Sequence, residues 1–79
     1  MGIKPGNIVK ATAGRDKDRF FVVLSVDSGY AAIADGKTRR VQSPKRKSLK
    51  HLAETNQQIS VNDATTNNSI KRILSHLNV

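Results

Sequence analysis

Cysteine and tryptophan are both absent from this chain of 79 residues, and aromatic side chains make up only 4% of it. Without thiols the chain forms neither disulfide bonds nor thiolate metal sites. The scarcity of aromatic rings leaves few platforms on which nucleic-acid bases could stack. A chain of this length forms one small domain with a modest core, which leaves little room for an enclosed catalytic pocket.

Long apolar segments are also missing. No run approaches the roughly 20 apolar residues that a membrane-spanning helix needs, and the opening MGIKPGN lacks the apolar region of a signal peptide. The sequence therefore predicts a cytoplasmic protein without membrane contacts, monomeric when free.

Residues suited to catalysis are few and scattered. His51 and His76 fall in different predicted elements with no set of carboxylates nearby, and Asp35 belongs to a predicted turn. The five glycines are isolated, so none forms a nucleotide-binding loop. We expect no enzymatic activity, no metal site and no cofactor.

Positive charge is plentiful and unevenly distributed. The formal net charge is +8, and all of the excess lies in residues 1–53, which hold 12 Lys and Arg against 4 Asp. Residues 37–51 alone carry seven Lys and Arg and no carboxylate. Such density of one sign is typical of a surface that binds a polyanion. The alternative is a solvated loop that only keeps the protein soluble.

Turn signals divide the first part of the chain into short strands. We expect strands at 8–12, 20–26 and 30–34, then an Asp35-Gly36 hairpin turn and a returning strand at 37–42. The second strand, FFVVLSV, is apolar on both faces, which indicates a central position. Pro44 has no N–H to donate, so we expect the chain either to leave the sheet there or to make a tight helical turn through 45–48, with a short fifth strand at 49–55.

These elements predict a mainly β fold, either a small barrel or a sandwich, and closure into a barrel would remove exposed strand edges. Residues 56–68 are polar and read as a linker. In the segment 69–78, apolar residues at Ile70, Ile73, Leu74 and Leu77 have helical spacing, with Thr66 or Asn67 available as N-cap. This helix of about 11 residues is marginal alone, so we expect it to pack on the barrel or on a partner.

Three segments together resemble a known family. GNIVKATAGRDKDRFFVVLSV, with Gly14 between two strands, resembles the KOW motif. The later pieces ADGKTRRV and SPKRKSLKHL are similar to small bacterial KOW-domain proteins related to eukaryotic-type large-subunit ribosomal proteins. The resemblance covers residues 3–55 and implies an SH3-like barrel over 1–55 that binds RNA, commonly ribosomal RNA. Asp18 stands where the family usually has glycine.

The candidate RNA contacts are basic side chains in two regions. A compact turn around Pro44 would fan out its cations, whereas the loop 14–19 alternates charges and has an alternative as a hydrophilic turn. If Val41 faces the core, Arg40 faces solvent, and Arg39 lies along the rim or pairs with Asp35. The predicted nucleic-acid-binding residues are Arg15, Lys17, Arg19, Arg40, Lys45, Arg46, Lys47, Lys50 and His51.

Recognition of bases is expected to contribute little. The two Phe residues are predicted in the core, and Tyr30 is either an exposed platform or a rim residue that covers the barrel. Binding through phosphates and RNA shape is therefore expected. We predict an RNA-binding protein associated with the ribosome or ribosomal RNA. Two alternatives stay open: a protein-interaction module of the transcription or translation machinery, with ribosomal proteins among its partners, and non-specific DNA binding.

Overall fold

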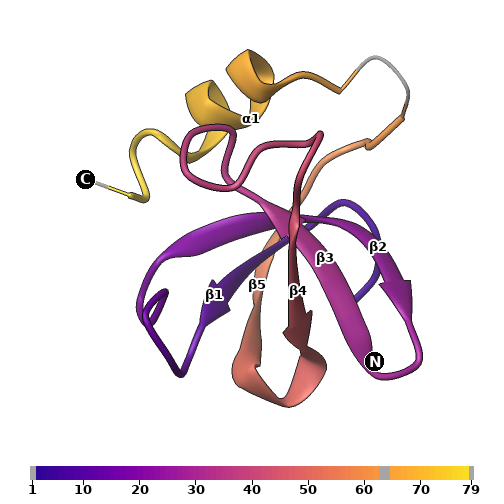
Figure 1. Cartoon of the computed structure of the whole chain (residues 1–79). Coiled ribbons are helices and arrows are strands. Elements are labelled where there is room, and N and C mark those ends of the chain that lie inside the picture. The colour runs from indigo at the N-terminus through magenta and orange to yellow at the C-terminus, as the bar shows by residue number, and fades with distance from the viewer. Residues whose placement is uncertain (1, 63–64, 79) are drawn as a thin grey trace.

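One antiparallel sheet and one helix make up the computed structural model, which describes residues 2–62 and 65–78. The sheet has the order β4-β3-β2-β1-β5 (Figure 1). No helix in the described part of the chain is long and apolar enough to cross a membrane. The elements are β1 (Asn7–Ala11), β2 (Phe20–Asp27), β3 (Tyr30–Ala34), β4 (Lys45–Ser48), the 3₁₀ turn η1 (Leu49–His51), β5 (Leu52–Gln58) and α1 (Asn67–Leu74).

The predicted mainly β fold of about five strands with a C-terminal helix is confirmed. The first three strands lie where the sequence pattern placed them, and β2 is the central strand. The arrangement is that of an open sheet, with β4 and β5 as its edges joined through η1, and it is consistent with a small SH3-like fold.

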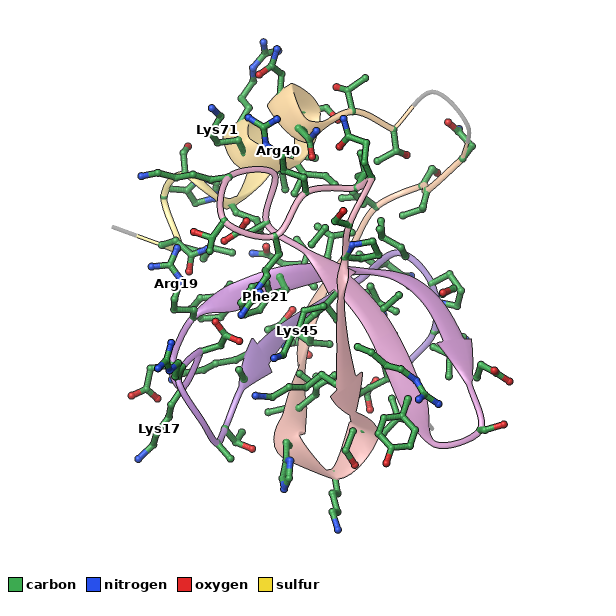
Figure 2. All side chains as sticks on the ribbon, in the orientation of Figure 1. Lys17, Arg19, Phe21, Arg40, Lys45 and Lys71 are labelled. Atoms are coloured by element: carbon green, nitrogen blue, oxygen red, sulfur yellow. The ribbon has the colours of Figure 1, made fainter. Side chains whose placement is uncertain are left out.

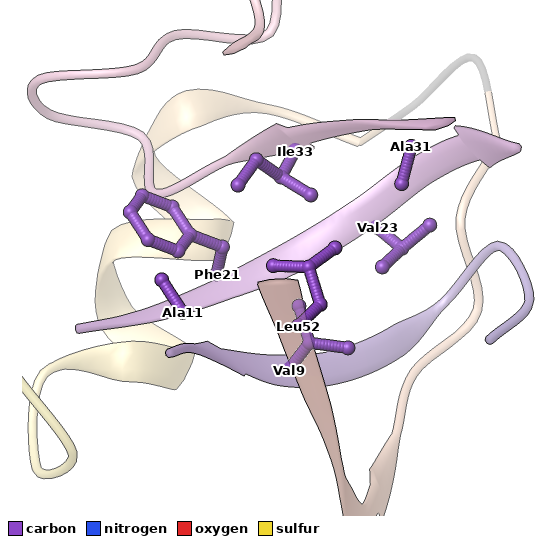
Figure 3. Packing of buried hydrophobic residues seen from close by; sticks show 7 residues of the cluster. All are labelled: Val9, Ala11, Phe21, Val23, Ala31, Ile33 and Leu52. Atoms are coloured by element: carbon purple, nitrogen blue, oxygen red, sulfur yellow. The ribbon is translucent and has the colours of Figure 1, made fainter. Parts of the chain in front are cut away.

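The central strand is apolar on both faces because each face is covered. Phe21 and Val23 point into an inner core, which the other strands complete. Val22 points to the opposite face, where α1 packs. Full burial of such a side chain stabilises the fold by roughly 1.5–3 kcal/mol. Figure 3 shows the inner core, formed by Val9, Ala11, Phe21, Val23, Ala31, Ile33 and Leu52.

The C-terminal helix begins at the predicted N-cap. Thr66 Oγ1 accepts a hydrogen bond from Ser69 N at 3.1 Å, and Ser69 Oγ accepts one from Thr66 N at 3.2 Å, which forms a capping box. Ile70 and Leu74 are buried against the sheet, while Ile73 and Leu77 are partly buried there. The apolar stripe therefore covers the second face of the sheet. Of the two arrangements predicted for the helix, packing on the β domain or on a partner, the first is the one observed.

The helix and the segment before it differ in extent from the prediction. The helix ends at Leu74, and a hydrogen bond from Leu77 N to Leu74 O continues the chain as a turn. The predicted linker 56–68 is partly strand, since β5 continues to Gln58. Residues 63 and 64 of that linker lie outside the described residues.

The predicted strand at 37–42 and its two-residue hairpin are wrong. Asp35 Oδ1 accepts hydrogen bonds from the backbone N–H groups of Lys37 (2.9 Å) and Arg39 (2.8 Å). Val41 N donates to Asn67 Oδ1 on α1 at 2.8 Å. Because side-chain oxygens take these donors, the segment forms a loop instead of a strand.

The predicted helical turn at 45–48 is also wrong. These residues form β4, which pairs with β3 in the register Ala31↔Lys47 and Ala32↔Arg46. Pro44 directly precedes the ladder, so its missing N–H removes no bond from the sheet. The helical turn comes later, as η1, and β5 runs from Leu52 to Gln58 instead of over 49–55.

Candidate nucleic-acid interface

Two basic segments that are far apart in the sequence lie against each other. The loop 12–19, between β1 and β2, is joined to β4 by a hydrogen bond of 2.8 Å from Lys47 Nζ to Ala13 O. A second bond of 2.8 Å, from Thr12 N to His51 O, joins the loop to η1. The loop and the β4–η1 segment therefore form one continuous surface, which we call the basic surface.

Lys47 belongs to the scaffold of this surface. Lys47 is only 9% exposed, and its ammonium group donates a hydrogen bond to Ala13 O. The expectation that it fans outward with its neighbours is wrong, because strand alternation turns Lys45 and Lys47 to one side of β4 and Arg46 to the other. The stem of Lys47 lies opposite Ala31, a residue of the inner core.

Two ion pairs join the loop 12–19 to the loop 35–44. Arg19 Nη2 lies 3.6 Å from Asp35 Oδ2, and Arg39 Nη2 lies 3.7 Å from Asp16 Oδ2. The Asp35 side chain is 2% exposed and that of Asp16 is 12% exposed. Of the two positions predicted for Arg39, the side-chain pair with Asp35 is wrong, although the backbone N–H of Arg39 does bind Asp35. Both carboxylates therefore point inward, beneath arginines that reach the surface.

Other predicted cations are available to a ligand. Arg15, Lys17, Arg40 and Lys50 are exposed, and Lys45 is half-buried. Within residues 2–62 and 65–78, none of these five side chains has a hydrogen bond or an ion pair. Figure 2 shows Lys17 at the outer end of the loop, with Arg19 between it and Lys71. The predicted exposure of Arg40 is confirmed, and its position near α1 places it away from Lys17.

His51 and Asp18 complete the interface. His51 is half-buried in η1, where its backbone carbonyl holds the loop 12–19. Asp18 has φ 72°, a conformation that glycine adopts at lower cost than a residue with a side chain. This backbone geometry explains why glycine would suit the position, as the family resemblance implied. Its carboxylate is 69% exposed and lies 3.8 Å from Lys10 Nζ, so one negative charge stays on the outside of the loop.

Arg46 lies on the opposite face of β4. Its guanidinium carbon Cζ is 4.1 Å from the centre of the Tyr30 ring, a cation–π contact. Tyr30 is 41% exposed and is the one large apolar residue that is exposed within the described ranges.

Sequence reasoning missed two lysines that lie beside Arg19. Lys37 and Lys71 line one pocket together with Arg19 and the buried Asp35. They meet because the loop at Gly36 passes directly against the first turn of α1. Residues 54–79 are electrically neutral, so their composition contains no signal for Lys71. The apolar stripe of the helix predicts that the helix packs on the sheet or on a partner, but it does not show which loop lies beside the helix.

No family model matches this chain, and no curated protein matches it either. The similarity to KOW proteins consequently rests on the residues quoted above. The described residues also contain no cluster of three or more His, Asp and Glu side chains that could hold a metal ion.

Proposed function

We propose that this protein is a KOW-type module that binds structured RNA through its phosphates and associates with ribosomal RNA or a ribosomal particle. The observation that carries the proposal is the basic surface. Its two segments are held together by backbone and lysine hydrogen bonds, and its exposed cations are available to a ligand. Asp16 of the loop and Asp35 beside it are covered by arginines. An approaching phosphate meets ammonium and guanidinium groups before it meets either carboxylate.

Binding is driven by release of counterions from the RNA. The sheet and its hydrogen-bonded loop act as a rigid support, so the protein backbone that carries the cations needs little reordering when they meet the RNA backbone. Five cations are proposed to contact phosphates, and log K should then fall with log salt at a slope of roughly −3.5 to −4.5. They are Arg15, Lys17, Lys45 and Lys50, together with Arg46 on the adjoining outer face of β4.

A protein-interaction module is the second candidate. It would use the apolar stripe of α1, but Ile70 and Leu74 are 0% and 2% exposed and pack on the sheet of the same chain. The helix therefore offers a partner mainly its polar side, which favours the RNA proposal. Non-specific DNA binding uses the same charges, so a DNA competitor is included in the test.

The test is fluorescence anisotropy of a labelled RNA hairpin across a salt series, with a DNA duplex as competitor. The test variant is Lys17→Gln with Lys50→Gln, two exposed cations of the basic surface. The control variant is Lys4→Gln with Arg72→Gln, which removes the same charge from exposed sites outside that surface. Neither pair has side-chain hydrogen bonds or ion pairs among the described residues.

We expect the test variant to lower the magnitude of the salt slope by about 1.4–1.8, since each lost phosphate contact accounts for about 0.7–0.9. The control should keep nearly the slope of the natural protein. Equal losses in both variants would mean that only the total charge matters, and a slope near zero in the natural protein would refute the electrostatic mechanism. Equal competition by DNA would indicate non-specific binding of polyanions.

A further inference from the structure

The outer face of the sheet carries a second feature beyond the area that α1 covers. In the ladder, Ser25 lies opposite Ala32, which lies opposite Arg46. In the next row with the same orientation, Asp27 lies opposite Tyr30. These rows therefore place one aromatic ring and one guanidinium beside three small or polar side chains, on one face of three adjacent strands.

The small residues leave a hollow between the larger ones. A groove there is lined by Ser25, Asp27, Tyr30, Ala31, Ala32, Pro44 and Arg46. Tyr30 and Arg46 stand at the groove with their planar groups in contact, at 4.1 Å from Cζ to the ring centre. Although Asp27 lines the same groove, Arg46 forms no ion pair with a carboxylate of the described chain. The guanidinium is thus held by the ring and keeps its donors available.

We propose that this groove takes one unpaired base of the bound RNA, which stacks on the Tyr30–Arg46 pair. The inference rests on the proposed function and adds a base-recognition site to it. Flat groups suit a flat ligand, because every base has a π-face and stacks on aromatic rings and on guanidinium planes.

Charged and polar groups near the groove suit the phosphate and the base of a nucleotide. Leu49 N donates to Gly29 O at 2.9 Å, so η1 and the exposed Lys50 lie beside the turn that precedes Tyr30. Lys50 and Arg46 supply the positive charge that a phosphate needs. Asp27 and Ser25 also line the groove and present oxygen acceptors. A carboxylate accepts hydrogen bonds and donates none, so it favours guanine, with its N1–H and amino donors, over uracil.

Tyr30 provides its own probe, since it is the one tyrosine in a chain without tryptophan. Tyrosine fluorescence and the NMR signals of the tyrosine ring therefore report on this position alone. The RNA probes are a hairpin whose loop is uridine except for one guanosine, the same hairpin with an all-uridine loop, and a blunt duplex without unpaired bases. A proline-rich peptide is the fourth probe, because an exposed Tyr beside a groove could also bind such a segment.

We expect the guanosine hairpin to quench the fluorescence and shift the ring protons upfield, with the all-uridine loop weaker and the duplex without effect. Tyr30→Leu should weaken binding of the guanosine hairpin about tenfold and leave duplex binding unchanged, whereas Tyr30→Phe should keep the affinity. Since Tyr30 is exposed, the Leu variant should fold, and its circular dichroism spectrum checks this.

Three results would overturn the inference. The hairpin could bind in the anisotropy assay without any change at Tyr30, and then the proposed function stands while the base site fails. The peptide could perturb Tyr30 at lower concentration than the RNA does, which would make the groove a peptide site. If no RNA binds at all, both proposals fail together.

Discussion

Lys47 and Lys45 offer a matched test of the structural argument. They lie two residues apart on the same side of β4, and each contributes one positive charge. Lys47 is 9% exposed and donates to Ala13 O at 2.8 Å. Lys45 is half-buried and has no side-chain partner among the residues described. Replacement of each by Met keeps an unbranched stem and removes the ammonium group.

The magnitude follows from the hydrogen bond. A bond from a charged donor contributes about 1.5–3 kcal/mol, and its loss also leaves the half-buried Ala13 carbonyl without this partner. Relief of the cost of burying an ammonium group offsets part of the loss, so we expect Lys47→Met to destabilise the protein by about 1–2 kcal/mol. Lys45→Met should stay within about 0.5 kcal/mol of the natural protein.

The assay is urea unfolding followed by circular dichroism, with thermal unfolding as a second measure. For a domain of this size, 1 kcal/mol corresponds to a shift in Tm of about 4–8 °C, so Lys47→Met should melt about 4–16 °C lower. Equal stability of the two variants would refute the structural role of Lys47. A larger loss for Lys45→Met than for Lys47→Met would show that the ammonium group of Lys45 contributes more to stability than the hydrogen bond from Lys47 to Ala13 O.

Further predictions concern the backbone. Gly36 has φ 79°, and a Cβ there would collide with Asn67 O on α1, whereas Gly29 has φ 82° and open space around it. Gly36→Ala should therefore destabilise the protein by more than Gly29→Ala, for which about 1–2 kcal/mol is expected; equal losses in urea unfolding would contradict the close approach of loop and helix. Asp18→Gly should leave the free energy of unfolding within about 1 kcal/mol of the natural protein, because its effects oppose one another. Glycine adopts φ 72° without strain, but it loses more backbone entropy on folding, and the exposed ion pair with Lys10 is lost. It should also tighten RNA binding in the anisotropy assay, since it removes a carboxylate from the basic surface; weaker binding would mean that Asp18 organises the loop.

Local patterns were sufficient for the first three strands and for the helix. The apolar residues on both faces of FFVVLSV predicted a central strand with two covered faces, and the helical spacing of Ile70 and Leu74 predicted the stripe that packs on it. Thr66 was one of two candidates for the N-cap. These features depend on residues that are close in the sequence, so the sequence pattern shows them directly.

The segment 35–48 could not be predicted in the same way. Its backbone donors have two competing sets of acceptors, a partner strand and nearby side chains. Asp35 captures Lys37 N and Arg39 N locally, but Asn67, which captures Val41 N, is 26 residues away. Once these donors are satisfied, pairing with β3 begins only at Lys45.

Composition and hydrophobic period act over short distances, so they were enough to predict a small basic β protein with a C-terminal helix. The role of each cation depends on contacts between parts of the chain that are distant in sequence. Lys47 supports a loop, Arg19 and Arg39 cover carboxylates, Arg46 stacks on Tyr30, and Lys17 remains available to a ligand. Formal charge is the same for all of them. Their roles differ because strand alternation and contacts between distant loops set how far each is buried and which group it meets.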